Sequence, residues 1–338
     1  MSSSPVISVS GLHKSYGDFE AVKGIDISVD RGEIFAFLGP NGAGKTTTVE
    51  ILEGYRSRSS GEVEVLGVDP AHPTHEWRGR VGVVLQECEL TPELTVTESV
   101  SQYAGYYDAP RGVQETVDLV GLAEKADVRA GKLSGGQRRR LDVALALVGD
   151  PDLLFLDEPT TGFDPLARRQ AWDVVRSLRD LGKTVFLTTH YMEEAQELAD
   201  RVAILAEGKI VAQGPPDELG GGERAVTRIT FNLPGPDTGN GALGHDDFPE
   251  TVRAALIPSG PGEGDGQRVH LRTAQATEVL AALTGWAIER GVELGALEAV
   301  RPSLEDVYLE LTGSQSSAQS EPEPDAKQGR RRRGRRSR

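Results

Sequence analysis

Short apolar runs recur along the first 215 residues, and most are followed at once by glycine or by a polar side chain. The clearest runs are residues 34–38, 81–85, 153–156, 184–189 and 201–206. Short apolar runs bounded by turn residues are typical of buried strands. The segments between the runs are long enough for helices, so this part of the chain is predicted to be α/β.

Alternating and helical patterns fill the segments between these runs. Residues 6–10, 25–31 and 62–68 have the pattern of antiparallel strands, residues 98–130 are polar and helical with breaks near 110–112 and 121, and residues 166–181 form an amphipathic helix. Leu141, Ala144, Leu145 and Val148 share one face of another helix. We therefore expect antiparallel β and helical subdomains beside the α/β core, the helical one at about residues 92–150.

The pattern changes after Pro215-Pro216 and the glycines at 220–222. Alternating residues at 226–231 and 269–271 predict strands, and a helix around Trp286 should stop at Gly291. Ser303 is expected to cap a last helix that ends near residue 311. The sequence thus predicts a first domain at 1–220, a small α+β domain at 224–312 with a regulatory or interaction role, and a disordered segment at 313–338.

Length and composition indicate where in the cell the protein is located. The chain has 338 residues, 38% hydrophobic and 26% charged, which suits about two globular domains. No apolar run approaches the roughly 20 residues that span a bilayer, and residues 1–5 lack signal-peptide character. One cysteine, Cys88, allows no internal disulfide and fits a reducing compartment, where we interpret it as a small, partly buried side chain. These features favour a protein kept in the cytosol.

Charge is distributed unevenly along the chain. The formal net charge is −15, yet residues 327–338 carry Lys327 and seven arginines without an acid. Without this tail the remainder is near −23, so the body is a poor ligand for nucleic acid or anionic lipid. The tail could bind anionic lipid at about 1 kcal/mol per charge near a surface, could bind nucleic acid, or could be a solvated segment without function.

A phosphate-binding loop is the strongest chemical signal. It comprises Gly39, Pro40, Asn41, Gly42, Ala43, Gly44, Lys45 and Thr46, and Thr47 follows it at the start of a predicted helix. Glycines in such a loop let backbone N–H groups approach an anion, and the helix N-terminus adds positive potential. Lys45 would reach the β- and γ-phosphates, and the Thr46 hydroxyl would bind Mg²⁺. A glycine-rich turn without a ligand would not explain the Lys-Thr pair and both flanking elements, so a nucleoside triphosphate is expected here.

Three predicted strands end in polar side chains that suit phosphoryl transfer. Gln86 ends one of them, where α/β folds place ligands, although a solvated glutamine is an equal alternative. Asp157 and Glu158 end the next, and such acids can hold Mg²⁺ and deprotonate an attacking water. His190 follows the third and could hydrogen-bond a terminal phosphate, although most single histidines are structural.

Two further features could contact a nucleotide. Tyr16 lies about 25 residues before the loop and could stack on a base, or be an ordinary loop aromatic. Ser134, Gly135, Gly136 and Gln137 begin a helix and so form a second device suited to an anion. An ordinary helix cap followed by a solvated face of three arginines is the alternative for that segment.

The ordered set of these motifs resembles the ATP-binding-cassette (ABC) family over about residues 6–220. The resemblance implies a P-loop NTPase (RecA-like) core in which Tyr16 stacks on adenine, Gln86 senses Mg²⁺ and the attacking water, Asp157 supports Mg²⁺, Glu158 is the general base and His190 contacts the γ-phosphate. Two ATP molecules are expected between two such chains, a homodimer, with the Ser134 helix of one chain facing the phosphates of the other. Phe163 replaces the leucine usual in the family, which should alter packing at the dimer seam without loss of chemistry.

The ending at residues 301–309 resembles the ATP-binding subunits of daunorubicin-resistance-type drug exporters. This resemblance implies an ATP-hydrolysing subunit at the cytoplasmic face of the membrane, where it powers efflux of a hydrophobic compound through a separate membrane permease. Alternatives are a soluble ATPase acting on ribosomes or nucleic acid, an importer ATPase, and a lipid or polysaccharide exporter. A nucleic-acid partner is disfavoured because the chain has a single cassette and no long coiled-coil insertion.

Overall fold

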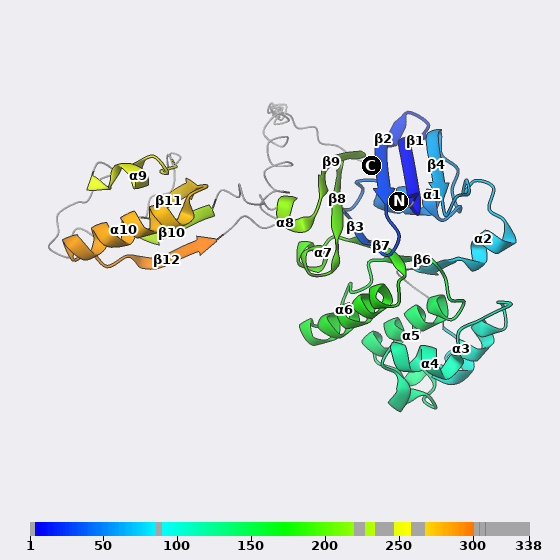
Figure 1. Cartoon of the computed structure of the whole chain (residues 1–338). Coiled ribbons are helices and arrows are strands. Elements are labelled where there is room, and N and C mark those ends of the chain that lie inside the picture. The colour runs from blue at the N-terminus through cyan, green and yellow to red at the C-terminus, as the bar shows by residue number, and fades with distance from the viewer. Residues whose placement is uncertain are drawn as a thin grey trace, which may run out of the picture.

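The computed structural model describes residues 4–85, 90–219, 227–233, 247–257 and 268–300, together with Leu304 and Tyr308 (Figure 1). Gln86, Cys88, the basic tail and most of the last predicted helix lie outside the described residues. Leu304 and Tyr308 are helical, as the sequence predicts for that segment.

A six-stranded sheet forms the centre of the first part of the chain. Its order is β5-β6-β7-β3-β8-β9, in which the first five strands are parallel and β9 runs antiparallel to β8. The strands are β3 (Ile34–Leu38), β5 (Val81–Val84), β6 (Leu153–Asp157), β7 (Thr184–Thr189), β8 (Arg201–Ala206) and β9 (Lys209–Gly214). All five apolar runs are therefore confirmed as strands, although β5 is only half-buried and ends before the exposed Leu85.

A cluster of aromatic rings packs on one face of this sheet. Phe186 lies with its ring centroid 5.4–5.7 Å from those of Phe35, Phe37 and Phe155, and all four side chains are fully buried. The same hydrophobic cluster includes residues of a second, three-stranded sheet of order β2-β1-β4. Its strands are β1 (Ile7–Tyr16), β2 (Phe19–Val29) and β4 (Ser60–Val65).

Strand β1 is longer than the sequence indicates. The pattern predicts a strand at 6–10 followed by a loop, but β1 continues to Tyr16. Gly11 has φ +54° and lies at a register shift in the pairing of β1 with β2. This bulge absorbs the glycine, so the strand continues where the sequence predicts a turn. Tyr16 is thereby placed at a strand end and is not an ordinary loop residue.

Helices cover the other face of the six-stranded sheet and form a bundle beside it (Figure 1). The bundle contains α3 (Val96–Ala104), α4 (Val113–Leu119) and α5 (Gly135–Leu147), and the sheet is also flanked by α6 (Pro165–Asp180) and α7 (Met192–Leu198). The helical stretch expected over 98–130 is confirmed only in part, since the residues after Leu119 form no more than 3-10 turns at Ala123–Lys125 and Ala130–Lys132. Gly121, in the left-handed region at φ +67°, follows the end of α4, which confirms the break expected at this residue.

The remaining helices of this part are short and occur at strand connections. They are α1 (Lys45–Leu52), α2 (His75–Gly79) and α8 (Pro216–Leu219). No helix in the described ranges has the length and apolar character needed to cross a membrane.

Residues 227–300 include a separate α+β unit with its own core. Strands β11 (Arg268–Thr273), β10 (Thr227–Asn232) and β12 (Gly295–Val300) form an antiparallel sheet in that order, accompanied by α9 (Glu250–Arg253) and α10 (Ala276–Arg290). In its core the Phe248 ring contacts both Phe231 and Trp286. Helix α10 ends at Gly291 (φ +63°) as predicted. Strand β12 was not predicted, because all six of its residues are exposed and its sequence shows no alternation of apolar and polar residues.

Candidate functional site

The phosphate-binding loop joins the buried strand β3 to helix α1, as the sequence predicts. Two of its glycines are required by close backbone approach. A Cβ on Gly39 would lie 2.4 Å from the Leu205 carbonyl oxygen, and one on Gly44 would lie 2.5 Å from that of Ala21. Gly44 also has φ +107°, a conformation that other residues avoid. Strands β2 and β8 therefore lie so close to the loop backbone that neither glycine has room for a side chain.

Lys45 lies along the inside of this loop. Its Nζ donates to the carbonyl oxygens of Gly39 at 2.7 Å and of Pro40 at 3.2 Å. Burial lowers the pKa of Lys45, while Glu158 and Asp157 raise it by their charge. A cation that has lost hydration by burial is stabilised by an anion, so Lys45 is suited to a phosphate group.

The loop opens onto a cavity of about 550 Å³, which is lined by most residues of the predicted phosphate-binding loop together with Glu158. Tyr16, Asn41, Gly42, Gly44, Lys45, Thr46, Thr47 and Glu158 line it, together with Phe19 and Ala21. The Tyr16 ring is 41% exposed and carries Lys14 Nζ 5.1 Å from its centroid. Arg56 Cζ also lies over this ring, 5.5 Å from its centroid. A partly exposed aromatic ring beside a phosphate loop can accept a stacked base where the base replaces such a neighbour. Phe19, 64% exposed, was missed because nothing in its local sequence distinguishes it from a turn aromatic.

Asp157 and Glu158 end strand β6, as predicted, and are fixed by the neighbouring strand β7. The Thr188 hydroxyl donates to Asp157 Oδ1 at 2.5 Å, and the Glu158 backbone N–H donates to the Thr188 carbonyl oxygen at 3.1 Å. Glu158 has φ +46°, which is unusual for a residue with a side chain. The turn directs the Glu158 carboxylate to the cavity that contains Lys45.

His190 follows strand β7 and contacts this carboxylate. Its Nδ1 lies 3.2 Å from Glu158 Oε1, and the Thr161 hydroxyl donates to Glu158 Oε2 at 3.0 Å. Both Glu158 oxygens thus have a neighbour that can orient them. The His190 ring also packs on Tyr191, with 4.1 Å between the ring centroids.

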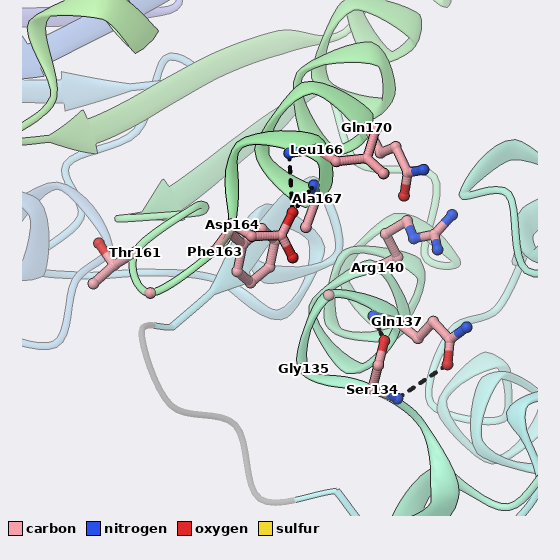
Figure 2. Close-up of a pocket in the computed structure, with 12 residues that line it drawn as sticks. Ser134, Gly135, Gln137, Arg140, Thr161, Phe163, Asp164, Leu166, Ala167 and Gln170 are labelled. Atoms are coloured by element: carbon pink, nitrogen blue, oxygen red, sulfur yellow. Dashed lines mark hydrogen bonds between the residues drawn. The ribbon is translucent and has the colours of Figure 1, made fainter.

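The Ser134 segment begins helix α5 with a capping box (Figure 2). Ser134 Oγ accepts from the Gln137 N–H at 3.3 Å, and Gln137 Oε1 accepts from the Ser134 N–H at 3.0 Å. Gly135 has open space where a Cβ would be, so its backbone is accessible. The helix cap considered for the sequence is therefore present, and it coexists with an open helix N-terminus.

A second cavity of about 510 Å³ lies at this helix start (Figure 2). Ser134, Gly135, Gly136 and Gln137 line it with the loop at 161–164 and the start of α6. Asp164 caps α6 by accepting from the N–H groups of Leu166 and Ala167, both at 2.9 Å. A Cβ on Gly136 would lie 4.0 Å from a Phe163 ring carbon, so Phe163 packs beside this cavity.

Most of the predicted site residues line two different cavities of one chain, whereas Gly39, Pro40, Ala43, Asp157 and His190 line neither. Other residues of the phosphate loop and Glu158 surround the first, and Ser134 to Gln137 surround the second, with no lining residue in common. Gln86 is outside the described residues. The helix start at Ser134 therefore does not line the Lys45 cavity of its own chain.

Arg139 is a structural residue that the sequence interpretation missed. The alternative of a solvated face for residues 138–140 is wrong for Arg139, which is only 8% exposed. Its guanidinium donates to the Asp157 carbonyl oxygen at 2.6 Å, to that of Pro159 at 3.3 Å, and to that of Leu85. Arg139 therefore links helix α5 to the ends of β5 and β6.

Glu194 is a second missed residue, behind the site in helix α7. This fully buried carboxyl accepts from the Thr160 hydroxyl at 2.8 Å and from Trp172 Nε1 at 3.2 Å. Burial raises its pKa, which hydrogen bonds and Arg168 oppose. The contacts connect the loop after Glu158 to the helix after His190. A charged residue within the acidic pair Glu193-Glu194 gives no sequence signal of burial.

The geometry defines a class of protein. A glycine loop between a central strand and a helix, a buried lysine, and a carboxylate pair at the end of another parallel strand are the features of a P-loop nucleoside triphosphatase. The chain also matches the family model described as ABC transporter over residues 22–161, and the model of the C-terminal domain of ABC transporter domain-containing-like proteins over 246–303.

Curated relatives match nearly the whole chain. A Nod factor export ATP-binding protein I from Ralstonia nicotianae is 39% identical over 318 residues, covering 92% of this chain and 95% of its own. The daunorubicin resistance ATP-binding protein DrrA3 of Streptomyces coeruleorubidus is 38% identical, covering 91% and 96%. This chain therefore belongs to the ATP-binding proteins of ABC transporters. It is an ATPase of the kind that couples ATP hydrolysis to transport.

A solved structure supports the fold. The structure of cbiO1 from Clostridium perfringens, described as part of the ABC transporter complex cbiONQ, superposes with a TM-score of 0.60 at 28% identity. It covers 66% of this chain and 93% of the other. The P-loop NTPase fold expected from the sequence is confirmed.

Proposed function

We propose that this chain is the ATPase subunit of an exporter that moves a hydrophobic, drug-like compound through a separate membrane permease. The observation that carries the catalytic part is the shared cavity of Lys45, Thr46 and Glu158. The transport part is supported by two relatives whose names refer to Nod factor export and daunorubicin resistance.

In the proposed reaction Glu158 is the general base. It takes a proton from a water molecule whose oxygen forms a bond to the γ-phosphorus of ATP, and the bond from that phosphorus to the β,γ-bridging oxygen breaks to release ADP and phosphate. Lys45 and the loop N–H groups stabilise the charge on the phosphates, and Tyr16 stacks on adenine. His190 orients Glu158 and contacts the γ-phosphate, and Gln86 senses the attacking water.

Oxygen donors at the site fit Mg²⁺. Thr46 and Asp157, with Gln86, would hold the ion, because Mg²⁺ is usually held by one or two carboxylates together with substrate phosphates. The bound ion would neutralise phosphate charge. The Thr188 hydroxyl, 2.5 Å from Asp157 Oδ1, already orients that carboxylate.

A complete site requires a second copy of the chain in this proposal. The Ser134 helix start lines its own open cavity, apart from the Lys45 cavity. Two copies arranged head to tail would place each Ser134 helix N-terminus on the γ-phosphate held by the other. Helix N-termini favour negative charge, so such a dimer would be strengthened by ATP.

The basic tail is proposed to help the ATPase subunit associate with the cytoplasmic membrane face. Its eight positive charges would attract anionic lipid in a salt-dependent way. Deletion of residues 327–338 should leave ATPase activity unchanged and weaken sedimentation with anionic vesicles at low salt. Equal sedimentation of both forms across a salt series would remove the tail from this role.

Co-production with the membrane protein encoded beside this chain tests the exporter. The complex should copurify in detergent, and cells that contain both proteins should accumulate less daunorubicin than cells with Lys45→Ala. Copurification with ribosomes in place of the membrane protein would favour the soluble-ATPase alternative. Equal accumulation with an intact complex would retain the transporter and exclude daunorubicin as its cargo.

A further inference from the structure

A stack of side chains joins helix α6 to His190. The Tyr191 ring centroid lies 4.1 Å from that of His190, with an angle of 39° between the two ring planes. The Arg168 guanidinium carbon lies 4.4 Å from the same Tyr191 centroid. Neither Arg168 nor Tyr191 lines the Lys45 cavity or the cavity at Ser134. Any influence of these two residues on ATP hydrolysis must therefore pass through a neighbour such as His190.

The His190 ring has few other contacts that could fix its orientation. Its side chain is 36% exposed, and its one polar contact among the described residues is that of Nδ1 with Glu158 Oε1 at 3.2 Å. A single contact leaves an imidazole ring free to turn about its side-chain bonds. The Tyr191 ring restricts this rotation by packing against His190. Tyr191 is itself tied to the end of β7, because its backbone N–H donates to the Thr189 hydroxyl at 3.0 Å.

The position of Arg168 suits stacking better than ion pairing. It lies in the first turn of α6, where its backbone N–H donates to the Asp164 carbonyl oxygen at 3.0 Å. Its ion pair with Glu193 has an N–O distance of 3.6 Å, and the Glu193 side chain is 70% exposed, so this pair is weak. Arg168 Nε is buried and has no hydrogen-bond partner within the described ranges. A lysine could make the same ion pair, but only a guanidinium offers a planar face to the Tyr191 ring.

A second explanation for Arg168 is that it compensates the buried Glu194. Its charge lowers the pKa of that carboxyl group, which burial raises. Compensation of Glu194 would not require the aromatic ring that contacts both Arg168 and His190. Substitutions of Tyr191 therefore separate the two explanations.

We propose that Arg168 and Tyr191 position His190 for ATP hydrolysis. Packed against the Tyr191 ring, the imidazole keeps Nδ1 beside Glu158 and leaves Nε2 available for the γ-phosphate. Arg168 in turn holds the Tyr191 ring from helix α6. Both are positioning residues, because they act through His190 and not on ATP itself. This inference rests on the proposed roles of Glu158 and His190.

Steady-state ATPase kinetics of the full-length chain test this positioning. Tyr191→Ala removes the ring and should lower kcat by about 10- to 100-fold, because a small displacement of a catalytic group has an effect of this size. Tyr191→Phe keeps the ring and should retain the wild-type kcat. Arg168→Ala should lower kcat by about tenfold, whereas the matched control Arg169→Ala, at the exposed neighbouring position, should leave it unchanged. The affinity for ADP should be unchanged in every variant, since ADP lacks the γ-phosphate.

Combination with His190→Ala distinguishes positioning from a general effect on the fold. Turnover of γ-labelled ATP is followed long enough to measure the slow variants. Tyr191→Ala should cause no further loss in a chain that already carries His190→Ala, because the group that it positions is then absent.

Three results would overturn the positioning role while the proposed function stands. They are an equal fractional loss with and without His190, an equal loss in Tyr191→Phe and Tyr191→Ala, and a wild-type kcat in Tyr191→Ala. A wild-type kcat in His190→Ala would instead overturn the proposed role of His190 and its positioning together.

Discussion

Glu158 combines an uncommon backbone conformation with the contacts expected of a catalytic base. Its φ of +46° places the side chain in the cavity of Lys45, and its N–H donates to both the carbonyl and the hydroxyl oxygen of Thr188 at 3.1 Å. A residue held in the left-handed region costs some free energy, which the pairing with β7 offsets. Such strain is commonly found at functional sites, which agrees with the proposed role.

Replacement of Glu158 by glutamine should separate binding from chemistry. The amide cannot accept the proton of the attacking water, so hydrolysis should fall by about 10²–10⁴-fold. The contacts of Lys45 and the loop N–H groups remain, and ATP should bind as tightly as before. Steady-state phosphate release and equilibrium binding of a fluorescent ATP analogue measure the two effects. Turnover close to that of the wild type would remove Glu158 from the base role.

Glu53 gives a prediction about pH and stability. The folded protein holds its pKa at about 8, above the ordinary value of 4.5, chiefly because the group is buried. The folded state therefore binds this proton more tightly than the unfolded state does. The stability contributed by neutral Glu53 is complete below about pH 4.5 and is lost as the pH rises toward 8.

Glu53→Gln should accordingly stabilise the protein at pH 8 and have little effect at pH 5. The glutamine stays neutral at both values, and the gain at pH 8 should be about 1–4 kcal/mol, since one pKa unit corresponds to about 1.4 kcal/mol. Thermal unfolding of both forms at the two pH values measures this. The exposed Glu62→Gln serves as control, and an equal shift of Tm at pH 5 and pH 8 would contradict the assignment.

At the scale of elements, the network of Glu194 joins α7, α6 and the loop that follows β6. Thr160, Trp172 and Glu194 are buried together, so this network fixes the loop that carries Thr161 and Asp164 relative to His190. Glu194 touches none of the reacting atoms and acts as a positioning residue. Burial raises the pKa of Glu194, whereas its hydrogen bonds and the charge of Arg168 lower it.

Glu194→Ala should lower kcat by about tenfold with little change in ATP affinity. It leaves the Thr160 hydroxyl and the Trp172 N–H without an acceptor, at about 1–3 kcal/mol each, and loosens the loop beside Glu158. Glu194→Gln retains an acceptor oxygen for both donors, so it should restore activity. The neighbouring exposed Glu193→Ala is the matched control. Equal loss of kcat in the alanine and glutamine variants would contradict a positioning role.

Elements with strong local signals were predictable, and those determined by long-range contacts were not. The runs that become β3, β6 and β7 are fully buried, and their continuous apolar sequence predicts strands. The glycine loop is recognisable because its glycines, lysine and threonine have the spacing that phosphate binding requires. Strand β12 is exposed throughout, and the extension of β1 depends on a bulge at Gly11. Arg139 and Glu194 are polar residues buried by tertiary contacts, which local periodicity cannot reveal.

At the scale of the whole molecule, the end of the described chain returns to the ATPase core. Leu304, only 1% exposed, belongs to the same hydrophobic cluster as the helix-covered face of the six-stranded sheet, and Tyr308 packs against it. The α+β unit at 227–300 lies between these two cassette-bound parts of the sequence and has a hydrophobic core of its own. Its regulatory or interaction role, and the domain boundaries near 220 and 313, remain predictions.

The residues expected to contact ATP are divided between two cavities of the chain. In the proposed dimer, one cavity of each chain meets the other cavity of its partner. Gly135 offers a clean way to test this, since a Cβ there meets no atom within 4 Å and the fold can accept a side chain. An aspartate at the start of α5 is compatible with the helix dipole in the free chain. In a head-to-tail dimer it would oppose the γ-phosphate of the other chain.

Sedimentation of the Glu158→Gln protein with saturating Mg²⁺ and ATP therefore tests whether two chains share each ATP site. The protein is predicted to double its mass when ATP is added, and Glu158→Gln/Gly135→Asp is predicted to bind ATP and remain a single chain. A Glu158→Gln protein that stays monomeric with ATP bound, while the wild type hydrolyses ATP at a specific rate independent of protein concentration, would contradict the shared site.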